Sequence, residues 1–457
     1  MEENQSISAK ENKMGTMPIP KLIITTSIPL IISLLVNNLY NLVDSIFVSH
    51  INEDALTGIS LAAPIQTIMI ALGCGLAVGL NAMVSKALGE KNREEVMQTA
   101  SAAMVMALGA YLIIVVLCLL MVEPYFRWQA GGNEVIAQYG TAYIRICMLF
   151  SFGQMTQWVF DRFLIATGKS SLFLITLGTA SIVNLILDPI LIFGYFGFPV
   201  LGTAGAAIAT VIGQCAGGLL GIYLNVKKNQ EIPIHFTLRI SGKCVVNILK
   251  VGIPTAIMQG IMSVMGVFIN TILYQFSSTA VAIYGIAMKV QNLAQIAVHG
   301  MNNGLIPIIA YNYGAKSRAR IQETIRCAFL YAVVIMVVIL MILEMIPDKI
   351  LLLFDASERM MSLGVPAMRI MSVSFFVSSV SIIFAAVFQG FGNGVSSMLL
   401  TFMRQVIILI LLLLIGAFAG EINFVWAAFV ITEVLSIPFG VFLYKKQQKQ
   451  LLQGGLL

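Results

Sequence analysis

Two aspartates, Asp44 and Asp188, lie within long apolar stretches of the chain, where a charged side chain is costly. An ionised carboxylate at the centre of a bilayer costs about 2.5–3.5 kcal/mol even on the lenient insertion scale. The apolar stretches of the first half offer no Lys or Arg near their middle as a partner, since Arg145 is expected near one end of its stretch. We therefore expect both aspartates to take part in function.

Polar side chains accompany these aspartates at the spacing of one helix face. The sets are Asn37, Asn41 and Asp44; Ser181, Asn184 and Asp188; and Thr203 and Thr210. A lipid-facing surface has no use for amides, so these faces are expected to turn toward protein or water. The alternative for any single amide or hydroxyl is a hydrogen bond to a neighbouring helix with no further role.

Carboxylates grouped with amide and hydroxyl oxygens suit two kinds of chemistry. Two carboxylates on facing helices can take up and release a proton. The same two groups, with Asn184 and a threonine hydroxyl, also supply the hard oxygen ligands that Na⁺ accepts. The residues therefore predict a site for a coupling cation and leave open whether it is H⁺ or Na⁺. No other metal and no cofactor is expected.

The composition places these residues in a membrane protein. Of 457 residues, 58% are hydrophobic and only 11% are charged, and the mean hydropathy is +0.92. Soluble domains carry roughly a quarter charged residues. Apolar runs of the about 20 residues needed to span a bilayer recur along the chain. The expected class is an all-α polytopic membrane protein.

Twelve apolar stretches alternate with polar loops and predict twelve transmembrane helices. They fall near residues 19–49, 57–85, 96–122, 135–166, 171–195, 201–226, 244–275, 279–312, 321–346, 360–391, 395–418 and 422–444. Several exceed the length that a bilayer needs, so tilted helices with ends that project beyond the lipid are expected.

Positive charge is distributed unevenly between the two sets of loops. Most Lys and Arg residues lie in one set of loops and in the two tails. The opposite loops hold only Arg127, Lys349 and Arg359, and the spans themselves hold Arg145, Lys289, Arg369 and Arg404. This bias predicts a multi-pass protein of the cell membrane with both termini in the cytoplasm. It also accounts for the net charge of +6 without a nucleic-acid partner.

The second half of the chain partly repeats the first at one constant offset. Matching positions are Pro29 and Pro254, Gly79 and Gly304, Gly89 and Gly314, Lys91 and Lys316, and Arg93 and Arg318. Because each half holds six spans, both copies enter the membrane in the same direction. We expect two six-helix bundles related by a pseudo-two-fold axis along the membrane normal, as in carriers that rock around a central site.

The predicted organisation has five parts. They are a cytoplasmic tail (1–18), an N-lobe with spans one to six (19–226), a cytoplasmic linker (227–243), a C-lobe with spans seven to twelve (244–444) and a second cytoplasmic tail (445–457). The first segment lacks the basic start and short apolar core of a signal peptide. The six cysteines include no CxxC pair, so free thiols are expected.

The second half carries polar stripes but no carboxylate in the middle of spans seven, eight or ten. Together with Asn37 and Asn41, the candidates for a cavity wall are Gln259, Ser263, Lys289, Asn292 and His299. His299 also fits a satisfied interior histidine, and Lys289 a lysine that pairs with a backbone carbonyl or reaches the membrane surface. The chain is thus predicted to be symmetric in scaffold and asymmetric in charge.

Several short motifs stand out, namely "VDSIFVSHI" in the first span, "NLILDPILIFG" in the fifth, "GTAGAAIAT" in the sixth and the matched loops "GEKNREE" and "GAKSRAR". With these motifs the sequence resembles the multidrug and toxic compound extrusion (MATE) transporters over nearly the whole chain. This resemblance implies antiport, in which an inward H⁺ or Na⁺ gradient drives the export of bulky, mainly cationic organic compounds.

The resemblance also implies roles for individual residues. Asp44 matches the carboxylate of the family's first helix, Pro29 its bend, and Asn184 and Asp188 its N-lobe cation pocket. Thr210, with Thr203 as the rival, matches the hydroxyl of the sixth helix. A subgroup places acids in spans seven and ten as a C-lobe cation site. This chain has none there, so the branches with an N-lobe cation site are the better fit.

The expected cycle is rocking of two lobes, with cation and organic compound excluding each other. The nearest alternative is a flippase for a lipid-linked sugar precursor, which would need a cluster of cavity cations where this chain offers only Lys289 and Arg404. An enzyme is not expected, because no HExxH, GxSxG or comparable constellation is present. The expected partners are small organic substrates and membrane lipids, and the protein is expected to be a monomer.

Overall fold

The structure, a computed structural model, describes residues 12–234 and 240–453, and these residues form helices without any strand. The first half contains α1 (Lys13–Thr16), α2 (Ile19–Ser49), α3 (Glu53–Gly89), α4 (Arg93–Gln129), α5 (Glu134–Leu149), α6 (Phe152–Ala166), α7 (Ser170–Phe193), the short 3₁₀-helix η1 (Tyr195–Gly197) and α8 (Thr203–Lys228). The second half contains α9 (Gly242–Phe276), α10 (Ser278–Gly314), α11 (Arg318–Met345), α12 (Pro347–Leu352), α13 (Glu358–Gly390), α14 (Gly394–Phe402), the π-helical turn η2 (Met403–Ile408), α15 (Leu409–Ala419) and α16 (Ile422–Gln453).

Among the described residues, eleven stretches of helix are long and apolar enough to cross a membrane, and α5 with α6 makes a twelfth as a pair bent by 49°. The span predicted over 135–166 is this bent pair. The helix stops at Leu149, and Phe150 leaves helical geometry. A Cβ on Gly153 would lie 2.5 Å from Sγ of Cys215, so α6 turns in to pack tightly on α8.

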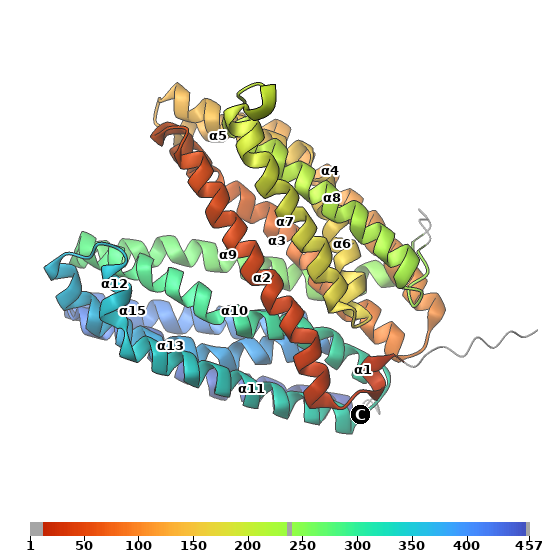
Figure 1. Ribbon diagram of the computed structural model, residues 1–457. Helices are drawn as coiled ribbons and strands as arrows, with labels where there is room; N and C mark the ends of the chain where they lie inside the picture. Colours follow the sequence, from red (N-terminus) through yellow and green to blue (C-terminus); the bar gives the residue numbers. More distant parts are fainter. Residues whose placement is uncertain (1–11, 235–239, 454–457) are drawn as a thin grey trace, which may run out of the picture.

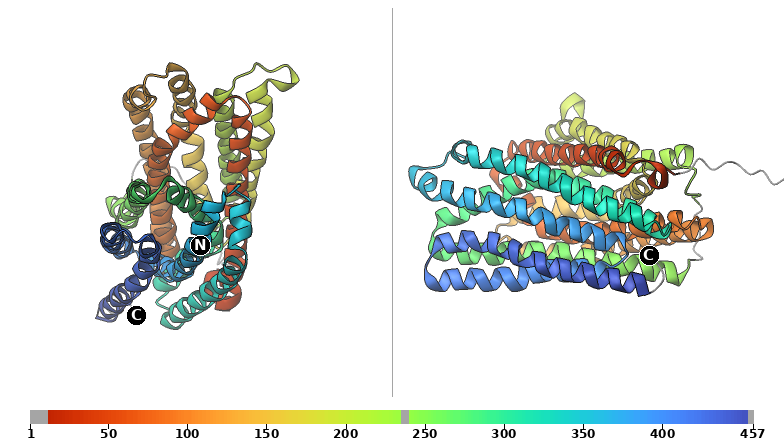
Figure 2. Two further views of the ribbon diagram at one scale, coloured as in Figure 1. Left: turned by 90° about the vertical axis from the view of Figure 1, so that its left-hand side faces the viewer. Right: turned by 90° about the horizontal axis from the view of Figure 1, so that it is seen from below.

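The helices form two six-span bundles, as the twelve-helix fold class predicted (Figure 1). The bundles lie side by side at one end of the molecule and diverge toward the other (Figures 1 and 2). Helix α3 packs along α9, and α10 packs along α2 and α3. The first turns of α2, with Ile19, Leu22 and Ile23, are part of the apolar core of the second bundle.

Glycines at matching positions of the repeat allow the two bundles to touch. A Cβ on Gly75 of α3 would lie 2.5 Å from the carbonyl oxygen of Gly252 in α9. A Cβ on Gly300 of α10 would lie 2.5 Å from Cγ1 of Ile31 in α2. Gly75 and Gly300 are separated by the same offset as the other repeat pairs. The backbone approach between the bundles thus follows the pseudo-symmetry.

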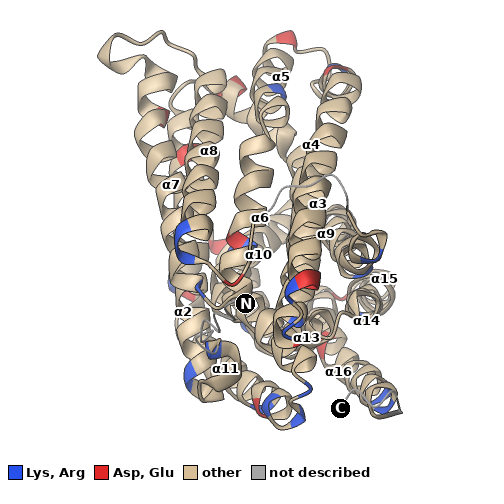
Figure 3. Cartoon of the chain, turned by 90° about the vertical axis from the view of Figure 1, so that its right-hand side faces the viewer, with Lys and Arg blue, Asp and Glu red and all other residues tan. Residues whose placement is uncertain are grey.

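We call the end where the bundles meet the basic end. The loops that follow α3, α6, α8 and α10 lie there, as do both described ends of the chain (Figure 3). Arg320 ties the two halves together at this end, because its guanidinium donates to the carbonyl oxygens of Met14 (2.9 Å) and Met17 (2.8 Å) and to Oδ1 of Asn312 (2.9 Å).

The predicted tails and linker are only partly described. Residues 1–11, 235–239 and 454–457 lie outside the described residues. In the part that is described, α1 forms a short helix within the predicted N-terminal tail, and α16 continues past residue 444 into the predicted C-terminal tail.

Candidate functional site

A cavity of about 380 Å³ lies inside the first bundle. Its walls come from α2, α3, α5, α6, α7 and α8. Polar and charged side chains gather at two places along it. We call these the outer cluster, formed by Asp44, Asn184, Asp188 and Thr210, and the inner pocket, formed by Gln157, Trp158, Asp161, Arg162 and Phe173.

Asn184 is the centre of the outer cluster. Its Nδ2 donates to Oδ1 of Asp188 and to the hydroxyl of Thr210, both at 3.2 Å. Asp188 is fully buried. The carboxyl group of Asp188 faces the carboxyl group of Asp44 on α2. The packing of α2, α7 and α8 thus brings these side chains together.

Three oxygens of the outer cluster are buried without a hydrogen-bond partner among the described residues. They are Oδ1 of Asp44, Oδ2 of Asp188 and Oδ1 of Asn184. Buried polar atoms are normally satisfied, so each exception calls for an explanation. A small cation would satisfy all three, and a proton shared between the two carboxylates would satisfy two of them. The donor set therefore fits the coupling cation that the sequence predicted.

The structure separates the two candidate threonines of α8. Thr210 bonds to Asn184. Thr203 begins the helix, is buried, and donates instead to the carbonyl oxygen of Tyr139 at 3.3 Å. Of these two threonines, only Thr210 contacts the outer cluster.

Asn37 and Asn41 line the same cavity from α2. Nδ2 of Asn41 donates to the backbone oxygen of Asn37 at 2.8 Å and to its Oδ1 at 3.2 Å. Pro29 lies earlier in α2, which continues through it as one helix from Ile19 to Ser49. Because Pro29 has no N–H, the carbonyl oxygen of Thr25 lacks its usual helical donor, and the helix can bend at this point. Ser33 donates to the carbonyl oxygen of Pro29 at 2.7 Å.

The candidates of the second half do not line this cavity. Ser263 donates weakly to the backbone of Gln259 in its own helix, at 3.4 Å. Nζ of Lys289 lies 5.4 Å from the centre of the Phe354 ring. Asn292 and His299 are exposed side chains of α10. The structure therefore gathers the first-half candidates and leaves these five apart from them.

The inner pocket contains residues that the sequence reasoning missed. Asp161 is 2% exposed and accepts a hydrogen bond from Thr176 at 2.5 Å. Arg162, expected with the loops of the basic side, lies within α6 and lines the cavity instead. Its Nη1 donates to Oδ1 of Asn303 in the second bundle at 3.1 Å. The spacing of Gln154, Gln157 and Asp161 on one helix face was the available signal.

The sequence matches the MatE family over residues 29–190 and again over 254–415. The chain belongs to this family. The two matches begin at Pro29 and Pro254, the pair of positions that the internal repeat superimposes. MatE proteins are membrane transporters, so this chain is a transporter and not an enzyme.

The sequence of this MatE chain aligns with those of known relatives over most of their length. It is 25% identical to the multidrug export protein MepA of Staphylococcus haemolyticus, over 89% of each chain. It is 23% identical to MepA of Staphylococcus aureus strain MRSA252, over 93% of this chain and 94% of the relative.

Solved structures support the same fold. A multidrug resistance MATE family transporter in an outward-facing conformation superimposes with a TM-score of 0.88 and 24% identity, over 97% of this chain and 99% of the other. A transporter from Pyrococcus furiosus, whose binding pocket is described as having reverse polarity, gives the same TM-score, identity and coverage. These likenesses establish the two-lobe architecture, so the bundles are called the N-lobe and C-lobe below.

The C-lobe of this MatE protein contains a buried ion pair. Nη1 of Arg404, in η2, lies 3.1 Å and 3.2 Å from the two carboxylate oxygens of Glu433 in α16. The two side chains are 11% and 9% exposed. Arg404 is thereby neutralised within the C-lobe and is not a free cavity cation. The glutamate was not recognised as its partner in the sequence.

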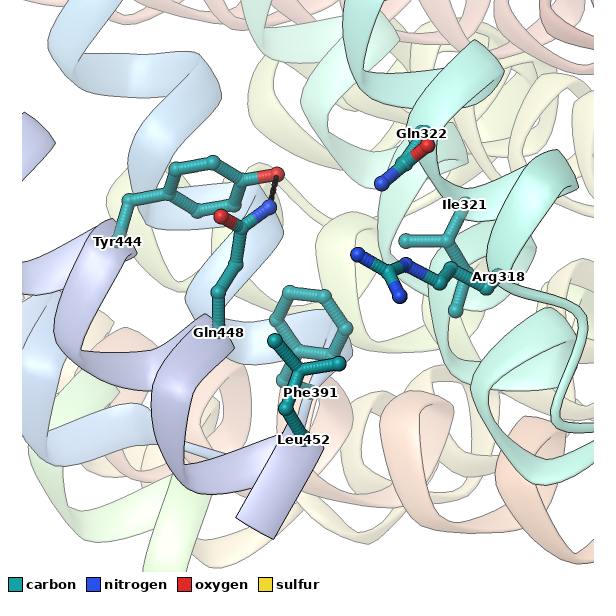
Figure 4. A pocket seen from close by; sticks show the side chains of 7 residues that line it. All are labelled: Arg318, Ile321, Gln322, Phe391, Tyr444, Gln448 and Leu452. Atoms are coloured by element: carbon teal, nitrogen blue, oxygen red, sulfur yellow. Dashed lines mark hydrogen bonds between the residues drawn. The ribbon is translucent and has the colours of Figure 1, made fainter. Parts of the chain in front are cut away.

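A second hollow lies between α11 and α16 at the basic end (Figure 4). Its lining includes Arg318, Gln322 and Tyr444, and Nε2 of Gln448 donates to the Tyr444 hydroxyl at 2.7 Å. Its volume of about 20 Å³ is close to that of a single water molecule. It is too small for an organic substrate, which leaves the N-lobe cavity as the candidate functional site.

Proposed function

We propose that this MatE transporter is a cation-coupled antiporter that exports organic, mainly cationic, compounds, with H⁺ or Na⁺ as the coupling ion. The supporting observation is the outer cluster, where oxygens of Asp44, Asp188 and Asn184 are buried without a partner among the described residues. The multidrug export activity named for the MepA relatives supports the substrate class. The protein acts in the cell membrane as a monomer.

The direction of transport follows from the charge distribution. Loops rich in Lys and Arg favour the cytoplasmic side, so the basic end faces the cytoplasm together with both termini. The lobes meet at that end and diverge at the other (Figure 1). The conformation is therefore outward-facing. Export would require the lobes to rock about their contact and open at the basic end.

Exchange follows if cation and substrate exclude each other. In the outward-facing state the outer cluster binds the cation from outside. Binding draws α2 toward α7, and α2 can bend at Pro29 as it does so, because the proline lacks the N–H of one helical hydrogen bond. The cavity narrows and the substrate leaves. In the inward-facing state the cation is released and a new substrate enters.

The flippase alternative is not favoured. It requires several free cations in the cavity to hold a pyrophosphate. Arg404 is paired with Glu433, and Lys289 lies outside the N-lobe cavity. Among the described residues, Arg162 is the one Lys or Arg that lines the cavity, and it already donates to Asn303.

The proposal is tested with purified protein in liposomes that contain a fluorescent organic cation. A proton gradient and a Na⁺ gradient are imposed separately on wild type and on Asp44→Asn. Efflux under one gradient and its loss in the variant would support the proposal and name the ion. No gradient-driven efflux in wild type, or equal efflux in the variant, would refute it.

A further inference from the structure

The two ends of the N-lobe cavity differ in chemistry. The outer cluster has carboxylate, amide and hydroxyl groups spaced for a small ion. The inner pocket combines one carboxylate, Asp161, and one guanidinium, that of Arg162, with the aromatic side chains of Trp158 and Phe173. A carboxylate beside aromatic faces is the arrangement that recognises organic cations, because charge and ring quadrupole both attract the cationic centre.

Asp161 is held in place by Thr176, which donates a hydrogen bond to its Oδ1. The Gln157 amide and the Arg162 guanidinium lie close enough to act on the same carboxyl group. Within residues 12–234 and 240–453 no Lys, Arg or His makes an ion pair with it. The neighbouring Arg162 donates across the lobes to Asn303. One turn earlier on α6, Nε2 of Gln157 is buried without a partner among the described residues, although the side chain lines the cavity. The Asp161 carboxyl group and the Gln157 amide therefore lie beside one another at this wall of the cavity.

Trp158 is fixed at the wall of the pocket. Its six-membered ring occupies the space where a side chain on Gly73 of α3 would be, so the indole packs directly on the α3 backbone. Phe173, on α7, is half-buried at the opposite wall. Pre-positioned aromatic side chains lower the cost of ordering the site when a ligand binds.

We propose that the inner pocket is the binding site for the cationic group of the exported compound, with Asp161 as counter-charge and Trp158 and Phe173 as aromatic walls. This inference rests on the proposed function and divides it between two places. The outer cluster binds the coupling ion and the inner pocket binds the organic cation. The coupling ion and the organic cation then compete in two ways, by repulsion between their positive charges and by movement of the cavity walls.

The test compares two ligands of one ring system. Ethidium carries a permanent charge, and its reduced form hydroethidine is uncharged. Binding of each to purified protein is followed by fluorescence for wild type, Asp161→Asn and the matched control Asp348→Asn, which removes an exposed carboxylate far along the chain on α12. We expect Asp161→Asn to weaken ethidium binding about tenfold or more and to leave hydroethidine binding unchanged. The control should bind both ligands as wild type does.

Trp158→Leu provides a second variant if Asp161→Asn does not fold. It should weaken ethidium binding several-fold more than hydroethidine binding. Equal loss for both ligands would show that the pocket only packs the lobe, and would overturn the assignment.

The inference and the proposed function fail differently. If wild type exports ethidium under an ion gradient but Asp161→Asn binds ethidium as wild type does, only the inner pocket assignment is wrong. If Asp161→Asn keeps ethidium affinity but loses the response to the ion gradient, Asp161 belongs to the coupling site and the inference is overturned. If wild type exports no organic cation, both proposals fail.

Discussion

At the scale of single residues, Asn184 explains how two aspartates can share one small space. It donates to Asp188 and to Thr210 at the same time, so its amide is fixed, and its Oδ1 is buried without a partner among the described residues. A buried polar network is rigid when all its members form hydrogen bonds, and its unpaired members are energetically costly. A cation bound by the unpaired oxygens of Asp44 and Asp188 would remove this cost.

Thr210 and Thr203 provide a matched pair of substitutions. Thr210→Val removes the hydroxyl that orients Asn184, and we expect the concentration of coupling ion for half-maximal efflux to rise about fivefold, the value of one hydrogen bond. Thr203→Val removes a hydroxyl that contacts only the Tyr139 backbone and should leave that concentration unchanged. Ion-dependent efflux from liposomes measures both. A larger effect at Thr203 would contradict the placement of the cluster.

The sequence predicted the outer cluster better than the inner pocket. Helical spacing identified one polar face in each apolar helix, and the family resemblance assigned Asp44, Asn184 and Thr210 of three different helices to one cation site. Asp161 and Arg162 lie near the end of their span, where charged residues are common and the same pattern is less informative. The pairing of Arg404 with Glu433 needed the packing of η2 on α16, which spacing along one helix does not reveal.

At the scale of elements, the Arg404–Glu433 pair connects the π-helical turn η2 to α16. Both side chains are almost fully buried, so neither charge can be compensated by water once its partner is removed. The pair is therefore expected to maintain the local packing of the C-lobe rather than to transport anything.

Removal of one partner should destabilise the C-lobe. Glu433→Gln leaves an uncompensated buried guanidinium, and we expect a loss of about 3–5 kcal/mol of stability. The measurement is the unfolding temperature of the purified protein in detergent. The double variant Glu433→Gln with Arg404→Met should recover most of the loss. A single variant as stable as wild type would show that the pair is not structural.

The broken span of α5 and α6 shows why element boundaries were harder to predict than element number. Apolar content located the membrane segment, but the chain has no proline at the break. The bend depends on Gly153 packing against Cys215 of α8, a tertiary contact. This bend places Asp161 and Arg162 of α6 on the cavity wall.

At the scale of the whole molecule, the contact between lobes is built from repeated small residues. The repeat was visible in the sequence, and it predicted two bundles in the same orientation. Which faces of the bundles touch could not be predicted, because that depends on backbone approach at Gly75 and Gly300. The contact between the two lobes at the basic end stabilises the conformation in which their opposite ends lie apart.

A side chain at Gly75 should disturb this contact. Gly75→Val places a branched side chain against the backbone of Gly252, and we expect a cost of about 1–3 kcal/mol to the outward-facing state. Efflux should fall while the protein still reaches the membrane. Gly109→Val is the control, because nothing lies within 4 Å of a Cβ at Gly109 of α4. Equal loss of efflux in the two variants would contradict a specific role for the lobe contact.

The most direct test of the central claim is counterflow driven by substrate. Organic cation is added on one side of liposomes that contain the purified transporter and no ion gradient, and movement of H⁺ or Na⁺ in the opposite direction is recorded with an indicator dye. We predict that wild type moves one of these ions in exchange for substrate and that Asp44→Asn does not. Substrate movement without ion movement in wild type, or unchanged exchange in Asp44→Asn, would contradict the account.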